Sequence, residues 1–186
     1  MMFLNGITDT KGFLESKGIT IWKGNTNRAY LDSHGFSDYA EGNMGLGYGF
    51  QWRNFGGVAD VADYDARGRS IFRGGNFGGV DQISELIKGL WEDPNSRRHL
   101  VSAWNPMDLP AMVLPPCHML QQYDLTRNKK DGSWRLDSLF FMRSSDLVYG
   151  LPFNMASYAF LNILFAKIVS MVSGLTIHPG NVTYIS

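Results

Sequence analysis

The sequence predicts an α+β protein, and three observations carry the prediction. A helix is expected over residues 83–91, where apolar residues recur at helical spacing. Strand-like runs follow at residues 99–104, 117–125 and 134–142, with a turn signal between the last two. A long apolar segment, residues 153–173, predicts a second helix of a different character. Helices and a hairpin in one chain of this length indicate mixed secondary structure packed around a shared core.

The first helix and the hairpin have clear local signals. The helix presents a single apolar face, and Pro94 is expected to end it. The turn signal is the run Asn-Lys-Lys-Asp-Gly at residues 128–132, which favours a hairpin between the strands on either side. The apolar face is formed by Ile83, Leu86, Ile87, Leu90 and Trp91.

The apolar segment 153–173 raises the question of a membrane. A membrane-spanning helix needs about 20 predominantly apolar residues. Polar residues interrupt this segment, so the sequence favours a buried core helix over a span, and Gly174 is a natural residue to end it. A final strand is expected to begin at residues 182–185. The interrupting residues are Asn154, Ser157, Asn162, Lys167 and Ser170.

The first half of the chain has weaker patterns. Residues 18–22 form a short run typical of a strand. Residues 42–55 are rich in glycine and aromatic residues. Residues 56–79 contain many Gly and Asp residues and no periodicity, so they are expected to form a long surface loop.

Composition and charge argue against several classes of partner and site. The 186 residues include 17 Lys and Arg against 17 Asp and Glu, which argues against nucleic acid or a membrane surface as a partner. The single cysteine, Cys117, excludes an internal disulfide framework and a multi-cysteine zinc site. No metal site is therefore expected, and a reducing, cytoplasmic setting fits best.

Two groups of residues could carry chemistry around the cysteine. Cys117 follows two prolines, and a nucleophilic cysteine acts as a thiolate that nearby cations stabilise. Arg97, Arg98 and Arg143 are candidate cations. Paired arginines on a turn also suit a phosphate, because guanidinium groups bind oxyanions bidentately. Taken alone, a buried structural cysteine and a solvated arginine pair are the simpler interpretations.

The second group lies between the last predicted strand of the hairpin and the apolar helix. Arg143, Ser144, Asp146 and Asn154 together offer donors and acceptors for a polar heterocycle. Asn154 either marks the start of the helix or reads the edge of a base, since its amide both donates and accepts.

The order and spacing of these motifs resemble the folate-dependent, cysteine-nucleophile thymidylate synthase family, from Phe3 to the last residue. The resemblance implies a single α+β domain over residues 1–186, with a large twisted mixed sheet and helices on one face. The other face would pack against the partner's sheet in a homodimer, and residues 152–173 would form the central buried helix. The matching segments are residues 21–22, 47–53, 96–98, 103–106, 114–118, 143–146 and 150–159.

The resemblance implies a reaction and its substrates. A one-carbon unit passes from methylenetetrahydrofolate, the co-substrate, to dUMP and is reduced to a methyl group, without a metal. Cys117 would attack the six-position carbon of the uracil. Arg143 would bind the phosphate close to the thiol, and Ser144 would add a hydrogen bond. Arg97 and Arg98 would reach the phosphate of the partner subunit.

The remaining family positions concern the base and the folate. Asn154 would pair with the uracil edge, and Asp146 would bind the pterin of the reduced folate. Trp22 and Asn25 would line the folate pocket. Tyr48 would assist proton removal through ordered water. His118, which follows the nucleophile, would have a supporting role.

The chain departs from the family pattern at Met142, where the family usually has Gln. Met at this place resembles phage pyrimidine nucleotide hydroxymethylases, so hydroxymethylation of dUMP or dCMP is an alternative. Asn154 argues against dCMP, because hydroxymethylases acting on dCMP tend to have Asp there.

The resemblance also places family residues outside the sequence. A catalytic Glu and an Arg-bearing loop would precede Phe3, and an Asp-x-His-x-Tyr segment would follow Ser186. The domain is therefore expected to be incomplete at both ends. A third alternative is an inactive fragment that folds, dimerises or binds nucleotide. The chain alone is expected to bind dUMP weakly, if at all, and not to convert it to dTMP.

Overall fold

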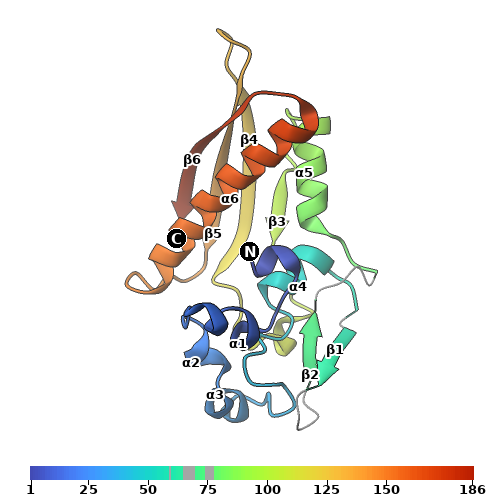
Figure 1. Cartoon of the computed structure of the whole chain (residues 1–186), viewed down its shortest axis with the longest axis vertical. Coiled ribbons are helices and arrows are strands. Elements are labelled where there is room, and N and C mark those ends of the chain that lie inside the picture. The colour runs from blue at the N-terminus through green and yellow to red at the C-terminus, as the bar shows by residue number, and fades with distance from the viewer. Residues whose placement is uncertain (59, 65–69, 74–77) are drawn as a thin grey trace. The chain divides into compact units, whose positions relative to one another are not determined.

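A computed structural model describes residues 1–58, 60–64, 70–73 and 78–186, and the chain divides into two compact units. Unit 1 comprises residues 1–82 and 102–116, and unit 2 comprises residues 83–101 and 117–186. Figure 1 labels the elements of both.

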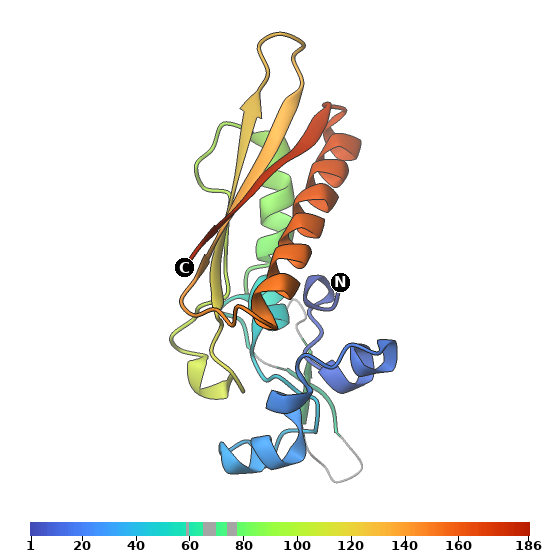
Figure 2. The same ribbon diagram turned by 90° about the vertical axis from the view of Figure 1, so that its left-hand side faces the viewer.

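Unit 2 contains a four-stranded sheet and the two longest helices. The strand order is β3-β4-β5-β6; β4 and β5 are antiparallel, whereas β5 and β6 are parallel, so the sheet is mixed as expected. Both helices lie on the same side of the sheet (Figure 2). The elements are α5 (Gln82–Glu92), β3 (Leu100–Ser102), β4 (His118–Arg127), β5 (Trp134–Met142), α6 (Gly150–Ser173) and β6 (Ile177–Ile185).

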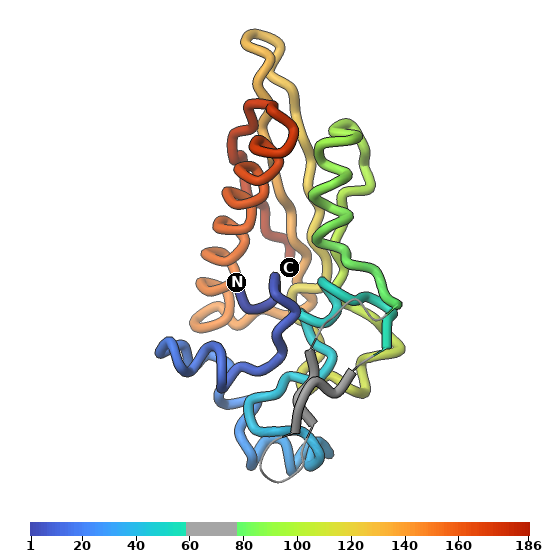
Figure 3. The backbone as a smooth tube through the Cα atoms, turned by 45° about the vertical axis from the view of Figure 1, so that its right-hand side comes forward, coloured from blue at the N-terminus to red at the C-terminus, as the bar shows by residue number. Residues whose placement is uncertain are grey.

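The β4–β5 hairpin forms where the turn signal predicts it. In the turn, Asn128 Oδ1 accepts from Lys130 N at 3.0 Å, and Asp131 Oδ1 accepts from Ser133 N at 2.9 Å. Gly132 has a φ of 75°, a backbone conformation that favours glycine. The turn projects past the ends of α5 and α6 (Figures 2 and 3). Local side-chain bonds therefore set the hairpin register without help from the helices.

The pairing register divides the side chains of unit 2 between two faces. Leu136, Phe140 and Met142 of β5 are buried on the face that α6 covers. Residues directly paired across strands share a face. Phe141 therefore shares the other face with its partners Leu120 on β4 and Ile185 on β6.

Helix α6 is confirmed, but the expectation that it is a central buried helix is only half right. One stripe is buried, whereas Phe160, Ile163 and Met171 on other faces are about half exposed or more. By length and composition alone, α6 is also the one helix of the described residues that could cross a membrane; core helices of soluble proteins pass the same test. The buried stripe is Tyr158, Leu161, Asn162, Phe165, Ala166 and Val169.

A buried amide connects α6 to the junction of β5 and β6. Asn162 Nδ2 donates to the backbone oxygens of Leu136 at 3.1 Å and Gly180 at 3.3 Å. The β5–β6 register shifts between Leu136 and Ser138, so regular ladder pairing is interrupted there. The Asn162 amide thus donates to backbone oxygens that regular strand pairing leaves without a donor.

Unit 1 consists of short elements around several small apolar clusters. Most of its helices are one or two turns long. The elements are η1 (Phe3–Asn5), α1 (Thr10–Phe13), η2 (Glu15–Lys17), α2 (Lys23–Thr26), α3 (Arg28–Ser33), α4 (Tyr48–Asn54), β1 (Asp60–Tyr64), β2 (Ser70–Arg73) and η3 (Leu109–Ala111).

Two sequence expectations for unit 1 are wrong, and one helix was not predicted. Residues 18–22 form no strand, because Gly18 ends a 3₁₀ helix with a φ of 75° and the chain turns directly into α2. Residues 42–55 contain α4. Within residues 56–79, where a long loop was expected, β1 and β2 pair as antiparallel strands. Residues 59, 65–69 and 74–77 of that expected loop lie outside the described residues.

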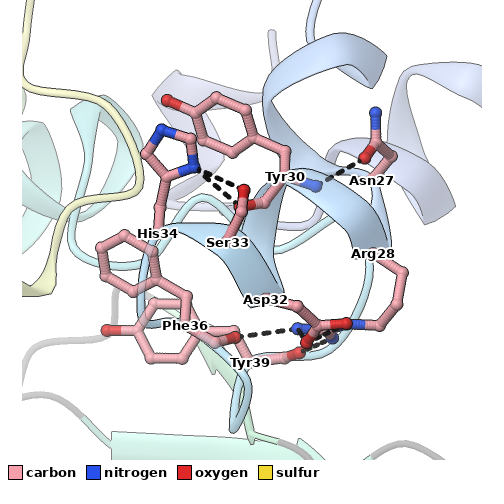
Figure 4. A network of polar contacts seen from close by, with 8 residues as sticks. All are labelled: Asn27, Arg28, Tyr30, Asp32, Ser33, His34, Phe36 and Tyr39. Atoms are coloured by element: carbon pink, nitrogen blue, oxygen red, sulfur yellow. Dashed lines mark hydrogen bonds and ion pairs between the residues drawn. The ribbon is translucent and has the colours of Figure 1, made fainter.

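Arg28 fixes the chain after α3. Its guanidinium donates to the backbone oxygen of Tyr39 at 2.6 Å and of Phe36 at 3.0 Å, and its Nε donates to Asp32 at 2.9 Å (Figure 4). The His34 ring stacks on Tyr30 at a centroid distance of 3.9 Å. Several donors on one rigid group thus replace regular secondary structure here.

Candidate functional site

Cys117 lies directly before β4 and is half-buried. Its backbone oxygen accepts a hydrogen bond from the backbone N–H of Arg143 at 2.9 Å, just beyond the end of β5. His118 and Met142, the adjacent residues, are paired in the β4–β5 register. The hairpin therefore brings the cysteine and the arginine together, although they are far apart in sequence.

The side chains of these two residues also meet. Arg143 Nη2 lies 3.8 Å from Cys117 Sγ, and Arg143 is exposed. The guanidinium thus occupies the place, beside the sulfur, where a nucleophilic cysteine needs a cation. The same exposed fork can bind a phosphate. The arrangement thus combines a candidate nucleophile with a candidate anion site.

His118 is buried beneath α6. Its Nδ1 lies 2.7 Å from the hydroxyl oxygen of Tyr158, and the two rings meet edge to face at 5.5 Å. Burial lowers the pKa of His118 to about 3, so the imidazole is neutral at pH 7. A neutral, buried histidine cannot serve as the cation beside the thiol, which leaves that role to Arg143.

Asn154 lies in the second turn of α6 and is half-buried. Its Nδ2 is 3.8 Å from Met142 Sδ, a weak contact with a poor acceptor. The amide therefore retains most of its hydrogen-bonding capacity for a stronger partner. Met142 itself is buried, at 5% exposure.

The loop from Arg143 to α6 is held by Asp146. Its Oδ1 accepts from the backbone N–H groups of Val148 at 2.9 Å and Tyr149 at 3.0 Å. These bonds, first the one from Tyr149, lower the pKa of Asp146. Asp146 thus has a local role in shaping the approach to α6, and its binding of a pterin stays a prediction. Ser144 is exposed in the same loop.

Arg97 and Arg98 are exposed in the connection between α5 and β3. The next residue, His99, accepts through its backbone oxygen from Tyr123 N of β4 at 2.9 Å. Tyr123 is six positions after Cys117, so at about 3.3 Å per residue the paired arginines lie about 20 Å along the strand. Within one chain, the structure does not bring them to Cys117.

Of the residues predicted to act on the folate side, Asp146 belongs to unit 2, whereas Trp22, Asn25 and Tyr48 belong to unit 1. Trp22 and Tyr48 meet edge to face at 5.9 Å, and Phe3 contacts both rings. Asn25 lies one helical turn after Trp22, where its backbone N–H donates to the Trp22 oxygen at 3.0 Å. Tyr48 is buried, whereas Trp22 and Asn25 are half-buried. Aromatic rings of this kind offer surface for a flat ring system.

Sequence reasoning missed Tyr158. The available signal was its spacing, because it lies four residues after Asn154 and so shares that residue's helix face. A tyrosine in an apolar helix carries no local sign that its hydroxyl has a buried partner. Among the described residues, no group of three or more His, Cys, Asp or Glu side chains is placed to hold a metal ion.

Comparison with known proteins gives a consistent result. A family model described as thymidylate synthase matches residues 1–185. The thymidylate synthase of Agaricus bisporus is 44% identical over 168 residues, which are 90% of this chain and 53% of that protein. The thymidylate synthase of Saccharomyces cerevisiae is 42% identical over 181 residues, which are 96% of this chain and 56% of that protein. A bifunctional dihydrofolate reductase-thymidylate synthase of Glycine max is 39% identical over 178 residues, which are 96% of this chain and 31% of that protein. The chain thus spans about half the length of the first two relatives.

Proposed function

Because the chain belongs to the thymidylate synthase family, we propose that it takes part in the reductive methylation of dUMP to dTMP, with methylenetetrahydrofolate as the co-substrate. The proposal depends mainly on one contact at the end of the β4–β5 hairpin, where Arg143 Nη2 lies 3.8 Å from the sulfur of Cys117. Asn154 of α6 contacts the adjacent residue, Met142. The fold thus brings a nucleophile and a cation together, and an amide contacts the residue next to that cation.

The chemistry begins with the thiolate of Cys117. Its sulfur forms a bond to carbon 6 of the uracil, and the electrons of the 5,6 double bond move towards the carbonyl at position 4. Carbon 5 then attacks the methylene group of the folate and loses its proton. Release of the folate nitrogen, transfer of a hydride from the folate to the methylene group, and cleavage of the carbon–sulfur bond give dTMP and dihydrofolate.

The residues around Cys117 have distinct parts in this scheme. Arg143 binds the phosphate and stabilises the thiolate, and Ser144 adds a hydrogen bond to the phosphate. Asn154 pairs with the donor and acceptor on the uracil edge. On the folate side, Asp146, Trp22 and Asn25 bind the cofactor, and Tyr48 assists removal of the proton through water.

We also propose that the site is completed by a second copy of the chain. Arg97 and Arg98 lie about 20 Å along the sheet from Cys117, which is too far for all three residues to act on one nucleotide within a chain. A two-fold dimer through the open face of the sheet would let these arginines reach the phosphate of the partner subunit. The homodimer accounts for two exposed arginines that have no role at their own site.

The experiment addresses the step that this chain's own residues carry, the attack of Cys117 on the pyrimidine. dUMP labelled with tritium at carbon 5 is incubated with the protein, and tritium released to water is counted. After the thiolate adds to carbon 6, carbon 5 can take up a proton from water and then lose the tritium as the sulfur leaves, so slow release is expected, with none from Cys117→Ala. Adding methylenetetrahydrofolate separates the reactions, because methylation produces dihydrofolate and hydroxymethylation does not.

A wild-type protein that binds dUMP but releases tritium no faster than Cys117→Ala would contradict the proposed nucleophile. Release accompanied by hydroxymethyl product without dihydrofolate would favour the hydroxymethylase that Met142 suggests.

A further inference from the structure

The contact between α6 and the start of β4 has a feature that the reaction scheme does not use. Tyr158 presents its hydroxyl to His118 Nδ1 at 2.7 Å, and both side chains are more than nine-tenths buried. The Tyr158 ring also stacks on Phe140 of β5, at a centroid distance of 4.1 Å and an angle of 14°. The hydroxyl is therefore held in place from both strands of the hairpin.

His118 is the residue immediately after the nucleophile. The β4–β5 register shifts between His118 and Leu120, so the regular ladder is interrupted just where the cysteine must be placed. A regular ladder would hold the backbone at the start of β4. Here a buried hydrogen bond to the His118 ring does so instead, because holding that side chain restricts the backbone of His118 and of Cys117 next to it.

The same face of α6 also carries Asn154. Asn154 and Tyr158 are four residues apart, so they are neighbours on the helix surface. They contact Met142 and His118, which are paired across the hairpin. One helix face thus touches both strands at the end that holds Cys117 and Arg143.

We propose that Tyr158 is a positioning residue for the nucleophile: through its hydrogen bond to His118 it holds the start of β4 so that Cys117 lies against Arg143. The inference rests on the proposed function for its catalytic meaning. Helix α6 then has two roles: it carries Asn154, which pairs with the base, and through Tyr158 it positions the sulfur of Cys117. The neutral form of His118 fits this role, since it leaves the contact free of a buried charge.

The test uses the single cysteine of the chain, because alkylation by iodoacetamide then reports Cys117 alone. Tyr158→Phe removes the hydroxyl and keeps the ring stacking. We expect the alkylation rate at pH 7 to fall at least threefold, since the sulfur loses its place beside the guanidinium. At pH 10 a cysteine thiol is ionised with or without a cation, so variant and wild type should react equally.

Tyr123→Phe is the matched control. It removes another buried tyrosine hydroxyl of unit 2, which donates to Gln121 at 2.8 Å. It should match the wild type at both pH values. Equal rates for wild type and Tyr158→Phe at pH 7 would overturn the proposal, and so would the same fold-change at both pH values, which would indicate altered access to the sulfur.

A second pair of variants serves if Tyr158→Phe fails to fold. His118→Asn replaces the imidazole by a side-chain amide that can still bond to the Tyr158 hydroxyl, and this variant should retain the pH 7 rate. His118→Leu removes the bond and should lose that rate. Equal rates in this pair would also overturn the proposal. Alkylation needs neither dUMP nor folate. A failed tritium assay with this pattern intact would therefore reject the proposed function and keep the positioning role.

Discussion

Asn154 shows how one amide can select a base. Uracil presents an acceptor and a donor where cytosine presents a donor and an acceptor, and a carboxamide can meet the first pair with its own N–H and C=O. A carboxamide that turned over could meet the cytosine pair as well, so selection of uracil requires the bound amide to be held in one orientation, with its N–H towards the uracil oxygen at position 4. A carboxylate at this position would be able only to accept.

Asn154→Asp is therefore expected to shift binding from dUMP towards dCMP. An unpaired buried group costs about 1–3 kcal/mol, so the ratio of the two dissociation constants should change roughly tenfold or more. Calorimetric titration with each nucleotide measures it. The control is Ser157→Asp, which adds the same charge at an exposed position of α6 and should change both affinities alike. An unchanged ratio in Asn154→Asp would refute the base-reading role.

At the scale of elements, the packing of α6 on β4 makes the stability of the fold depend on pH. Burial lowers the pKa of His118 to about 3 in the folded chain, against 6.5 when unfolded. Between these values the unfolded chain binds more protons, so lowering the pH favours unfolding. The contribution of the neutral histidine is complete above pH 6.5 and is lost as the pH falls towards 3.

We expect His118→Asn to reduce the slope of unfolding free energy against pH between 6.5 and 4.5. The reduction should approach about 1.4 kcal/mol per pH unit, the limit for one proton. Urea denaturation at several pH values measures it. His34→Asn, a change at an exposed histidine of unit 1, should leave the slope as it is. If both variants keep the wild-type slope, His118 is protonated without opening the α6–β4 contact.

The elements that the sequence predicted well are those with local signals. The ends of β5 match the predicted run 134–142, because strand and turn residues coincide there. Helix α4 was missed since six of its seven residues are buried, Gln51 and Asn54 among them, so its polar and apolar residues do not separate onto an outer and an inner face. For α6 the opposite problem arises: an almost uniformly apolar helix shows that it is a helix, but not which side faces the sheet.

The candidate site could be predicted in its members but not in its geometry. The resemblance to a family supplied Cys117, Arg143 and Asn154. The distance between Cys117 and Arg143 depends on the register of β4 and β5, and the contact of His118 with Tyr158 depends on how α6 lies on the sheet. Both are tertiary properties, which residue spacing along one chain does not contain.

For the whole molecule, the open face of the sheet is the expected dimer surface. One row of paired residues lies on the side opposite α5 and α6 and consists of Leu120, Phe141 and Ile185. We expect Phe141→Glu to shift the dimer to monomers, because in the dimer a charge at the centre of this row would be buried without a partner. Sedimentation equilibrium at micromolar concentration measures the shift. Met171→Glu, at an exposed position of α6 on the opposite side of the sheet, is the control and should stay dimeric. A monomeric wild-type protein would contradict the proposed assembly.

The most direct measurement of the central claim, that Cys117 attacks carbon 6 of a uracil nucleotide, is the mass of a trapped adduct. Fluorine at carbon 5 cannot leave as a proton does, so 5-fluoro-dUMP and methylenetetrahydrofolate should remain attached to the enzyme after the one-carbon unit is joined. The account predicts a protein whose mass has increased by both compounds, with the label on the peptide containing Cys117 and no label in Cys117→Ala. A protein that binds the nucleotide and keeps its unmodified mass, or that carries the label on another residue, would contradict it.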